Sequence, residues 1–399
     1  MRQSTSILLI AVVCSCTIDS PSTPPTLSAA GLARANDGTT AAMYELVRLP
    51  DLGNAPSRGS AINGQGWVAG FSTLPTGERH AAQWRNRQPI DLGTLGGPHS
   101  TVQWPGENAA GMVVGIAQTA IDEPLHEEWS CSAFLPTSGK VCLGFAWYEH
   151  RLHPMPTLGG NNSYAAGVNS AGRVVGWAET PVHDPTCNAP QVLQFRAVQW
   201  EPSTGALRQL PPLLGDSSSA ATAINARGQV VGISGDCDVA VGRFSARHSV
   251  IWRDGKPSEI PNLGGEAWHT PTAVNEAGDV VGFSNPTGVV GGAFLPHAFL
   301  WNAAHGLIDL GLLPGDDNSQ AFGINARRQV VGVSCKGSIC RAFLWDNGVM
   351  TNLKSLMGST FADSLLSARD INDAGHITGN VRDFVSGKTM AFVATPRTR

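Results

Sequence analysis

The densest group of residues that could do chemistry lies between residues 99 and 128. It comprises His99, Glu107, Asp122, Glu123, His126, Glu127 and Glu128. Paired carboxylates with a histidine nearby are what acid–base catalysis requires, for example in glycoside cleavage. Acids clustered on a long loop are more often a solvated surface, which is the interpretation we favour. We therefore assign no catalytic residue from this group.

Three tryptophans lie outside the repeated positions, in loops or at their borders. These are Trp104, Trp129 and Trp268. Exposed indole rings on a concave surface stack on apolar ligand faces, including sugar rings. The alternative is that each ring packs against its own part of the fold. Together with polar neighbours they form our candidate ligand-binding set, which is Trp104, Glu107, His126, Trp129, Trp268 and His269.

Two short acidic groups offer oxygen ligands of the kind that calcium prefers. They are Asp236 with Asp238, and Asp316 with Asp317 and Asn318. Neither group matches the EF-hand pattern, so we predict no cofactor and keep calcium as the alternative. The chain also has no Gly-x-Ser-x-Gly elbow, no phosphate-binding glycine-rich loop before a helix and no HExxH motif, which removes the common signatures of hydrolases and nucleotide enzymes.

A repeated phrase sets the architecture that must position these residues. An Asn, a Gly three residues later and a short apolar run closed by a second Gly recur, with variations, at Asn63, Asn108, Asn169, Asn225, Asn275, Asn325 and Asn372. The copy from Ala223 to Ser234 has the sequence AINARGQVVGIS. Repeats at spacings of about 50 residues indicate a propeller or a stacked array. We number the units one to seven in the order of these asparagines.

Two further phrases complete each unit. One is a strand that ends in Trp, such as HAFLW from His297 to Trp301, and its last copy is the degenerate MAFVA from Met390 to Ala394. The other closes in Leu-Gly, such as IDLGTLGG from Ile90 to Gly97. Four short strands joined by turn residues make one propeller blade. We expect the repeated Asn residues to serve turns, the Trp residues to pack between blades, and the His residues to hydrogen-bond the blade edge.

The two ends of the repeat region complement each other. The region opens at Tyr44 with a Leu-Gly strand that lacks its Trp-strand, and it closes with MAFVA, which lacks its Leu-Gly strand. Joined, they make one ordinary blade, so the ring closes without an open edge. We predict an all-β, seven-bladed β-propeller of four-stranded blades over residues 43–396, closed by pairing of the N-terminal strand with the C-terminal strand. A β-helix and an eight-unit count are the alternatives.

These phrases resemble one known family. HAFLW, IDLGTLGG and the INxxGQVVGxS pattern are similar to the signature of the extracellular HAF-repeat proteins, named for the His-Ala-Phe of the Trp-strand. The resemblance extends from Tyr44 to Ala394. It departs at Arg328, which replaces the turn Gly, and in blade two, which has GENAAGMVVGIA. It implies a secreted bacterial β-propeller-like protein and no particular reaction, and a fold by itself supplies none.

The N-terminus has the features of an export signal. A positive residue precedes the apolar run from Ile7 to Val13, as in a secretory signal peptide. Ser15 gives Cys16 the small preceding residue of a lipoprotein cleavage site. We therefore predict a signal peptide at residues 1–16 and lipidation of Cys16.

Residues 17–42 are rich in Pro, Ser and Thr and are expected to be a linker. Together with the lipidated cysteine, this linker predicts an outer-membrane lipoprotein. Cleavage near Ala33–Ala35 would instead release a secreted protein. Both alternatives place the repeat region outside the cytoplasm.

The remaining cysteines suit an exported protein. Six of them lie beyond Cys16, and an even number outside the cytoplasm indicates disulfides. Two pairs bracket single short loops, and a third pair occupies equivalent loops of blades three and four. We predict the disulfides Cys131–Cys142, Cys187–Cys237 and Cys335–Cys340. A zinc site is the alternative, but the spacing matches no usual ligand pattern.

The composition of the chain limits the classes of partner that we expect. With 46 Gly, 26 Pro and only 15% charged residues, the chain suits short strands joined by many tight turns. The formal net charge of −4 provides no basic surface, so nucleic acid is not expected as a partner. No apolar stretch of about 18 residues follows residue 40. We expect membrane attachment only through a lipid anchor, and a monomer.

Function is expected on one face of the ring. The connection between the second and third strands spans about 7 residues in blade one, 26 in blade two, 17 in blade three and 12 to 13 in blades four and five. Variable loops on a rigid scaffold are where binding concentrates. We predict a non-catalytic, extracytoplasmic binding or interaction module for an unknown ligand, either a carbohydrate or an envelope protein. The alternatives are a polysaccharide-active enzyme with acids among Glu107, Asp122, Glu127 and Glu128, and an envelope scaffold.

Overall fold

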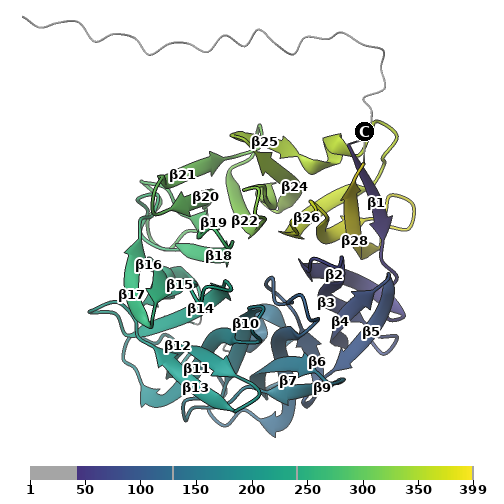
Figure 1. The fold of residues 1–399 in the computed structure, drawn as a ribbon. Coiled ribbons are helices and arrows are strands. Elements are labelled where there is room, and N and C mark those ends of the chain that lie inside the picture. Colours follow the sequence, from purple (N-terminus) through teal and green to yellow (C-terminus); the bar gives the residue numbers. More distant parts are fainter. Residues whose placement is uncertain (1–42, 128–129, 240, 398–399) are drawn as a thin grey trace, which may run out of the picture. The chain divides into compact units, whose positions relative to one another are not determined.

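Seven four-stranded antiparallel sheets surround a central axis, which confirms the predicted seven-bladed propeller (Figure 1). The structure is a computed structural model that describes residues 43–127, 130–239 and 241–397. The predicted signal peptide, the linker, Cys16, Glu128 and Trp129 lie outside the described residues. Within the described ranges, no helix is both long and apolar enough to span a membrane.

The first three blades follow one another along the chain. Blade one contains β2 (Asn54–Ile62), β3 (Val68–Thr73), β4 (Arg79–Arg85) and β5 (Gln88–Gly93). Blade two contains β6 (Gly96–Thr101), β7 (Val113–Asp122), β8 (Lys140–Tyr148) and β9 (Arg151–Pro154). Blade three contains β10 (Ser163–Val168), β11 (Val174–His183), β12 (Leu193–Glu201) and β13 (Ala206–Leu210).

The next three blades have the same order. Blade four contains β14 (Ser218–Ile224), β15 (Val230–Gly235), β16 (His248–Arg253) and β17 (Lys256–Ile260). Blade five contains β18 (Thr270–Val274), β19 (Val280–Ser284), β20 (His297–Asn302) and β21 (Gly306–Gly311). Blade six contains β22 (Asn318–Ile324), β23 (Val330–Lys336), β24 (Ile339–Asp346) and β25 (Val349–Asn352). Short helical segments are α1 (Ser130–Phe134), η1 (Arg243–Ala246) and η2 (Leu353–Leu356).

Blade seven closes the ring with strands from both ends of the repeat region. It contains β26 (Ser364–Ile371), β27 (Ile377–Arg382), β28 (Thr389–Pro396) and, as its outer strand, β1 (Tyr44–Arg48). β1 pairs antiparallel with β28, with Leu46 opposite Ala394. The predicted closure is confirmed, and it leaves no blade with an incomplete sheet.

The core lies between neighbouring blades, where the repeated tryptophans pack. Trp252 of blade four is 1% exposed and belongs to one cluster with Val175 and Leu210 of blade three. Its indole nitrogen donates to the Pro211 carbonyl oxygen at 2.7 Å. The histidines that begin the Trp-strands pair with acids on the adjacent outer strand, as His297 does with Asp309 at 2.8 Å. The repeated Trp and His residues thus have the structural roles expected of them.

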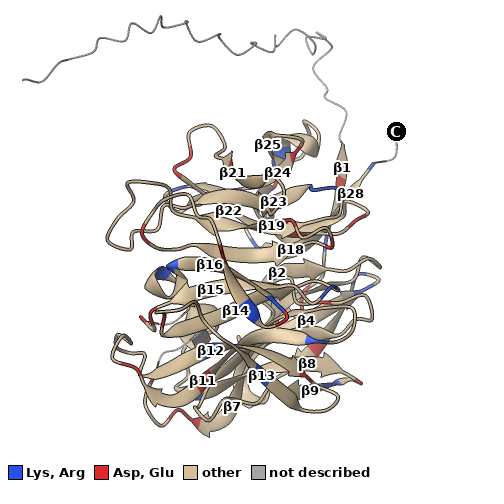
Figure 2. Cartoon of the chain, turned by 60° about the vertical axis from the view of Figure 1, so that its left-hand side comes forward, with Lys and Arg blue, Asp and Glu red and all other residues tan. Residues whose placement is uncertain are grey.

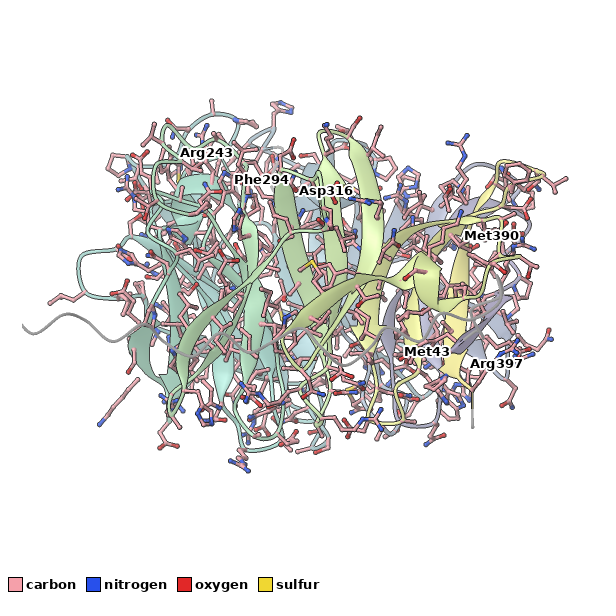
Figure 3. All side chains as sticks on the ribbon, turned by 90° about the horizontal axis from the view of Figure 1, so that it is seen from above. Met43, Arg243, Phe294, Asp316, Met390 and Arg397 are labelled. Carbon is pink, nitrogen blue, oxygen red and sulfur yellow. A yellow bond between two sulfur atoms is a disulfide. The ribbon has the colours of Figure 1, made fainter. Side chains whose placement is uncertain are left out.

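The two faces of the ring differ in their connections. We call the face that carries the Asn turns and the turns after the Trp-strands the turn face, and the opposite face the loop face. Viewed edge-on, Arg243, Phe294 and Asp316 lie on the loop face, whereas Met43 and Arg397 lie towards the turn face (Figure 3). The longest loop-face connection, residues 123–139 of blade two, is shorter than predicted, because β7 and β8 extend into it.

All three disulfides have the predicted pairing. Cys131–Cys142 lies within blade two, and Cys335–Cys340 closes the β23–β24 hairpin of blade six. Cys187–Cys237 joins the loop-face connections of blades three and four. Only this last bridge links one blade to another.

Candidate functional site

A cavity of about 600 Å³ lies around the propeller axis and opens on the loop face. Inner strands of blades four to seven form one part of its wall. Loop-face connections of blades two, four and five form the other part. Because these connections differ in length and sequence from blade to blade, the lining of the cavity does not follow the repeat. We refer to this cavity as the axial cavity.

Blade two contributes to the axial cavity because its inner strand is interrupted. β6 ends at Thr101, and Pro105 cannot donate a ladder hydrogen bond. The chain leaves the sheet there and brings Gln103 and Trp104 into the cavity wall. The indole nitrogen of Trp104 is enclosed and has no hydrogen-bond partner in the described part of the chain.

Trp268 is the second tryptophan in the cavity wall, and its orientation is fixed. Its backbone has φ 64°, an uncommon left-handed conformation for a bulky residue. The indole nitrogen donates to the Gly292 carbonyl oxygen at 2.9 Å, and the ring meets Phe294 edge-on at 4.9 Å. A Cβ on Gly242 would lie 2.6 Å from the ring, so only glycine permits this packing. The sequence prediction thus singled out two tryptophans, Trp104 and Trp268, that line one cavity.

Arg369 brings the single positive charge among the described residues that line the axial cavity, and no carboxylate lines it. Its guanidinium stacks over the Phe322 ring at 4.1 Å, and its Nε donates to the Ser367 hydroxyl at 3.3 Å. Burial lowers the pKa of Arg369 to about 10. The side chain is therefore a partly desolvated cation that remains charged at neutral pH.

Arg58 lies behind the wall of the cavity. It is 9% exposed, donates to the Ser60 hydroxyl at 3.3 Å and also donates to Oε1 of Gln103. Burial, followed by the positive charge of Arg369, lowers the pKa of Arg58 well below its ordinary value. The two guanidiniums repel each other, and together they create one region of positive potential.

These arginines were not among the predicted site residues, although the sequence contains a signal for them. Counted back from the repeated Asn, the third position holds Ser60, Pro105, Ala166, Thr222, Thr272, Phe322 and Arg369. The fifth position holds Arg58, Gln103, Tyr164, Ala220, Thr270, Gln320 and Ser367. Several members of both rows line the axial cavity. These two positions vary most in size and polarity from blade to blade, and this variation marks side chains that face the axis.

Two predicted ligand-binding residues are buried elsewhere. Glu107 lies on the turn-face side, where its Oε1 accepts from Gln83 at 2.7 Å and from Asn63 at 3.3 Å. His269 is fully buried, with Nδ1 2.7 Å from the Ser284 hydroxyl and Nε2 hydrogen-bonded to a backbone carbonyl at 3.1 Å. Burial lowers the pKa of His269 to about 4. Neither residue lines the cavity, so the structure removes both from the candidate ligand-binding set.

The solvated surface predicted for the blade-two acids is wrong for Glu123 and Glu127, which are buried and position loops. Glu127 accepts hydrogen bonds from the backbone nitrogens of Val192 and Leu193 at 2.7 and 2.5 Å, which ties blade two to blade three. Its carboxyl faces the buried carboxyl of Glu179, and burial together with the Glu127 charge raises the pKa of Glu179. Asp122 is exposed and pairs with Lys140 at 2.6 Å. Glu127 and Glu107 lie on opposite faces of the ring and do not converge.

His126 lies away from the axial cavity. It is exposed and lines a separate hollow of about 200 Å³ beside Glu123. Three of the candidate calcium ligands pair with arginines: Asp236 with Arg247, Asp238 with Arg243 and Asp316 with Arg341. Within the described ranges, no group of three or more His, Cys, Asp or Glu residues could hold a metal ion.

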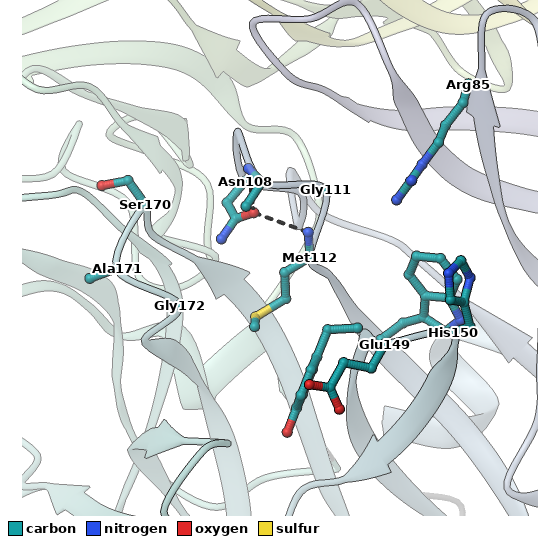
Figure 4. Close-up of a pocket in the computed structure, with 12 residues that line it drawn as sticks. Arg85, Asn108, Gly111, Met112, Glu149, His150, Ser170, Ala171 and Gly172 are labelled. Carbon is teal, nitrogen blue, oxygen red and sulfur yellow. Dashed lines mark hydrogen bonds between the residues drawn. The ribbon is translucent and has the colours of Figure 1, made fainter.

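A second hollow, of about 390 Å³, lies on the turn face between blades one, two and three (Figure 4). Arg85 and His150 line one side of it, and Met112 lies at its centre. A hollow of about 370 Å³ occupies the corresponding place between blades three and four, where Arg173 and Gly228 line it. A space that recurs at blade interfaces is a consequence of the repeat, so we favour the axial cavity as the site.

No protein-family model and no curated protein matches the chain. Among solved structures, the chain is similar to dipeptidyl peptidase 4 of Porphyromonas gingivalis, with 10% identity, a TM-score of 0.39, and coverage of 83% of this chain and 51% of the other. It is also similar to acylaminoacyl peptidase of Pyrococcus horikoshii, with 10% identity, a TM-score of 0.46, and coverage of 82% and 50%. The chain thus spans about half the length of either peptidase, and similarity at this level carries no functional implication.

Proposed function

We propose that this protein is an extracytoplasmic binding module of the HAF-repeat type that takes a saccharide into the axial cavity. The observation that carries the proposal is the cavity itself, with Trp104 and Trp268 in its wall. Its volume of about 600 Å³ falls within the range of about 300–1,000 Å³ that is usual for ligand pockets.

The mixture of side chains supports a saccharide. Indole and phenyl rings offer flat apolar surfaces for the faces of a sugar ring. Gln103, Gln320 and Asn380 line the same cavity and offer amide groups for hydroxyls. The three disulfides support a location outside the cytoplasm, because such bridges persist in oxidising compartments.

The same lining favours binding over cleavage. General acid–base catalysis requires a carboxylate, histidine or similar group within reach of the bond that breaks. Among the described residues of the cavity wall there is neither a carboxylate nor a histidine. We therefore expect the protein to bind a saccharide in this cavity without cleaving it.

The test is retention of the protein on immobilised bacterial and plant polysaccharides, with released reducing ends measured in the same samples. We expect retention without release, weakened about tenfold by Trp268→Ala, which corresponds to about 1.4 kcal/mol. Trp67→Ala is the matched control, because Trp67 lies on the turn face and stacks with Arg85 at 4.2 Å. Release of reducing ends, or equal retention of the two variants, would contradict the proposal.

A further inference from the structure

The charge balance of the axial cavity is one-sided. Arg369 lines the cavity and Arg58 lies directly behind it, yet no ion pair between either arginine and a described carboxylate is formed. Burying a charge without a counter-ion is costly, and each arginine increases the cost for the other. The chain as a whole is negative, with a net charge of −4. In Figure 2 its charged positions are scattered with both signs intermixed.

Other blades have an uncharged residue at the position that Arg369 occupies in blade seven. In blades one, four and five the equivalent positions hold Ser60, Thr222 and Thr272, whose hydroxyls donate to backbone carbonyls of the next blade at 2.7 to 2.9 Å. Arg369 replaces that link between blades with a partly buried charge at the cavity wall. A substitution that gives up a stabilising contact for an unpaired cation indicates a role other than stability.

Hydrogen bonding around the arginines leaves further donors free for a ligand. The Arg58 side chain can only donate hydrogen bonds, so the Gln103 atom that it contacts must be the amide oxygen. The NH₂ group of Gln103 is therefore not used by Arg58. Arg369 donates to the Ser367 hydroxyl, which in turn donates to Oδ1 of Asn380. The NH₂ group of Asn380 has no partner among the described residues. Both amides line the cavity.

Donors that gather beside an unpaired guanidinium match an anionic oxygen group. Arginine binds carboxylates and related oxyanions through two parallel hydrogen bonds, and amide NH₂ groups extend such a site. The nearby Phe322 ring holds the guanidinium plane and so reduces the entropy lost on binding. Trp104 and Trp268 then remain available for the ring that carries the anion.

We propose that the axial cavity recognises a sugar that bears an anionic group, a carboxylate or a sulfate, and that Arg369, Gln103 and Asn380 contact this group. The inference rests on the proposed function and narrows its ligand class. Arg58 acts as a positioning residue, because it fixes the orientation of Gln103 and adds to the positive potential. Neutral sugars of the same shape lack the counter-charge that the cavity needs.

Calorimetric titration of the full-length protein tests this inference with matched probes. Trigalacturonate and its methyl ester share the same rings and differ in charge, and a sulfated trisaccharide with its desulfated form provides the second pair. We expect the anionic member of at least one pair to bind at least about tenfold more tightly than its neutral partner. Arg369→Gln should abolish the preference, whereas Arg247→Gln, at an exposed ion pair of the loop face, should retain it.

Equal affinity within both pairs, or an undiminished preference in Arg369→Gln, would overturn the inference. Retention of neutral saccharides alone would also overturn it while leaving the proposed function intact, and retention of no saccharide would refute both. If Arg369→Gln does not fold, as judged by its thermal unfolding, Asn380→Ala serves as the second variant and should reduce the preference. The comparison of charged and neutral probes on the unaltered protein requires no variant.

Discussion

The side-chain nitrogen of Asn372 donates to the backbone carbonyl oxygen of Asn63 at 2.9 Å, although 309 residues separate them. This bond is the last of seven that run around the turn face, each from one repeated Asn to the carbonyl of the next. The Oδ1 atom of each repeated Asn accepts hydrogen bonds from backbone N–H groups of its own turn. In blade three, for example, Oδ1 of Asn169 accepts a hydrogen bond from the backbone nitrogen of Arg173 at 3.0 Å. The repeated Asn therefore stabilises its turn, as predicted, and also joins its blade to the next one.

Asn169→Asp separates the two roles of this residue. A carboxylate still accepts the turn hydrogen bonds, but it has no hydrogen to donate to the Asn225 carbonyl oxygen, 3.2 Å from Nδ2. We expect a loss of about 1–3 kcal/mol of unfolding free energy at neutral pH, because a buried carbonyl loses its partner beside a negative charge. Urea denaturation measures the loss. A change below about 0.5 kcal/mol would mean that the inter-blade bonds are dispensable.

The recurring Gly of each Val-Val-Gly run has a steric cause. A Cβ on Gly232 would lie 2.0 Å from the carbonyl oxygen of Ala220 on the paired inner strand. Gly232→Ala is expected to destabilise the protein by about 3 kcal/mol or more, because a closely packed backbone must move. Gly64→Ala is the control, since nothing lies within 4 Å of its added Cβ. Similar thermal unfolding midpoints for the two variants would contradict this packing.

The disulfides are expected to differ in their contribution to stability. Cys187–Cys237 closes a loop across 50 residues, whereas Cys335–Cys340 spans 5. The chain-entropy model assigns about 4 kcal/mol to the first and about 2 kcal/mol to the second. Paired Cys→Ser variants, compared by chemical denaturation, should therefore rank in that order. The opposite ranking would show that linking blades three and four does not govern stability.

Stability should depend on pH through Glu107. This residue occupies a position where the other blades have Ile or Val, and burial raises its pKa from 4.5 to about 8. The folded state then holds the proton more tightly than the unfolded chain. The stability that this proton contributes is fully present below about pH 4.5 and is lost as the pH rises through about 8.

Asp370, with a pKa raised to about 7 by burial, acts in the same direction. Unfolding free energies of the unaltered protein should accordingly fall between about pH 5 and 8. Glu107→Gln should flatten this dependence, because the amide does not titrate. A variant whose pH dependence is as steep as that of the unaltered protein would remove Glu107 as the cause.

The fold could be predicted because its determinants are local and repeated. Turn residues, the Trp-strand and the Leu-Gly strand each recur near a fixed place, and the incomplete units at Tyr44 and Met390 revealed the closure. Two disulfides were predicted because their cysteines bracket one short loop each, and Cys187–Cys237 because its cysteines occupy equivalent loops of neighbouring blades. The length of the blade-two loop was overestimated, because β7 and β8 extend past the repeated phrase.

The site was only partly predictable. Trp104 and Trp268 were identified because they break the repeat, and the structure places both in one cavity. Glu107 and His269 also break it, but their side chains are directed into the protein, which depends on register and inter-blade packing. Arg369 was missed, because its axial position becomes evident only when seven inner strands are arranged in a ring.

The most direct test of the account is a crystal structure of the protein with trigalacturonate bound. We expect a sugar ring against Trp268 and a carboxylate about 3 Å from the guanidinium of Arg369. A ligand bound in the turn-face hollow beside Arg85, or an axial cavity that remains empty while the ligand binds elsewhere, would contradict it.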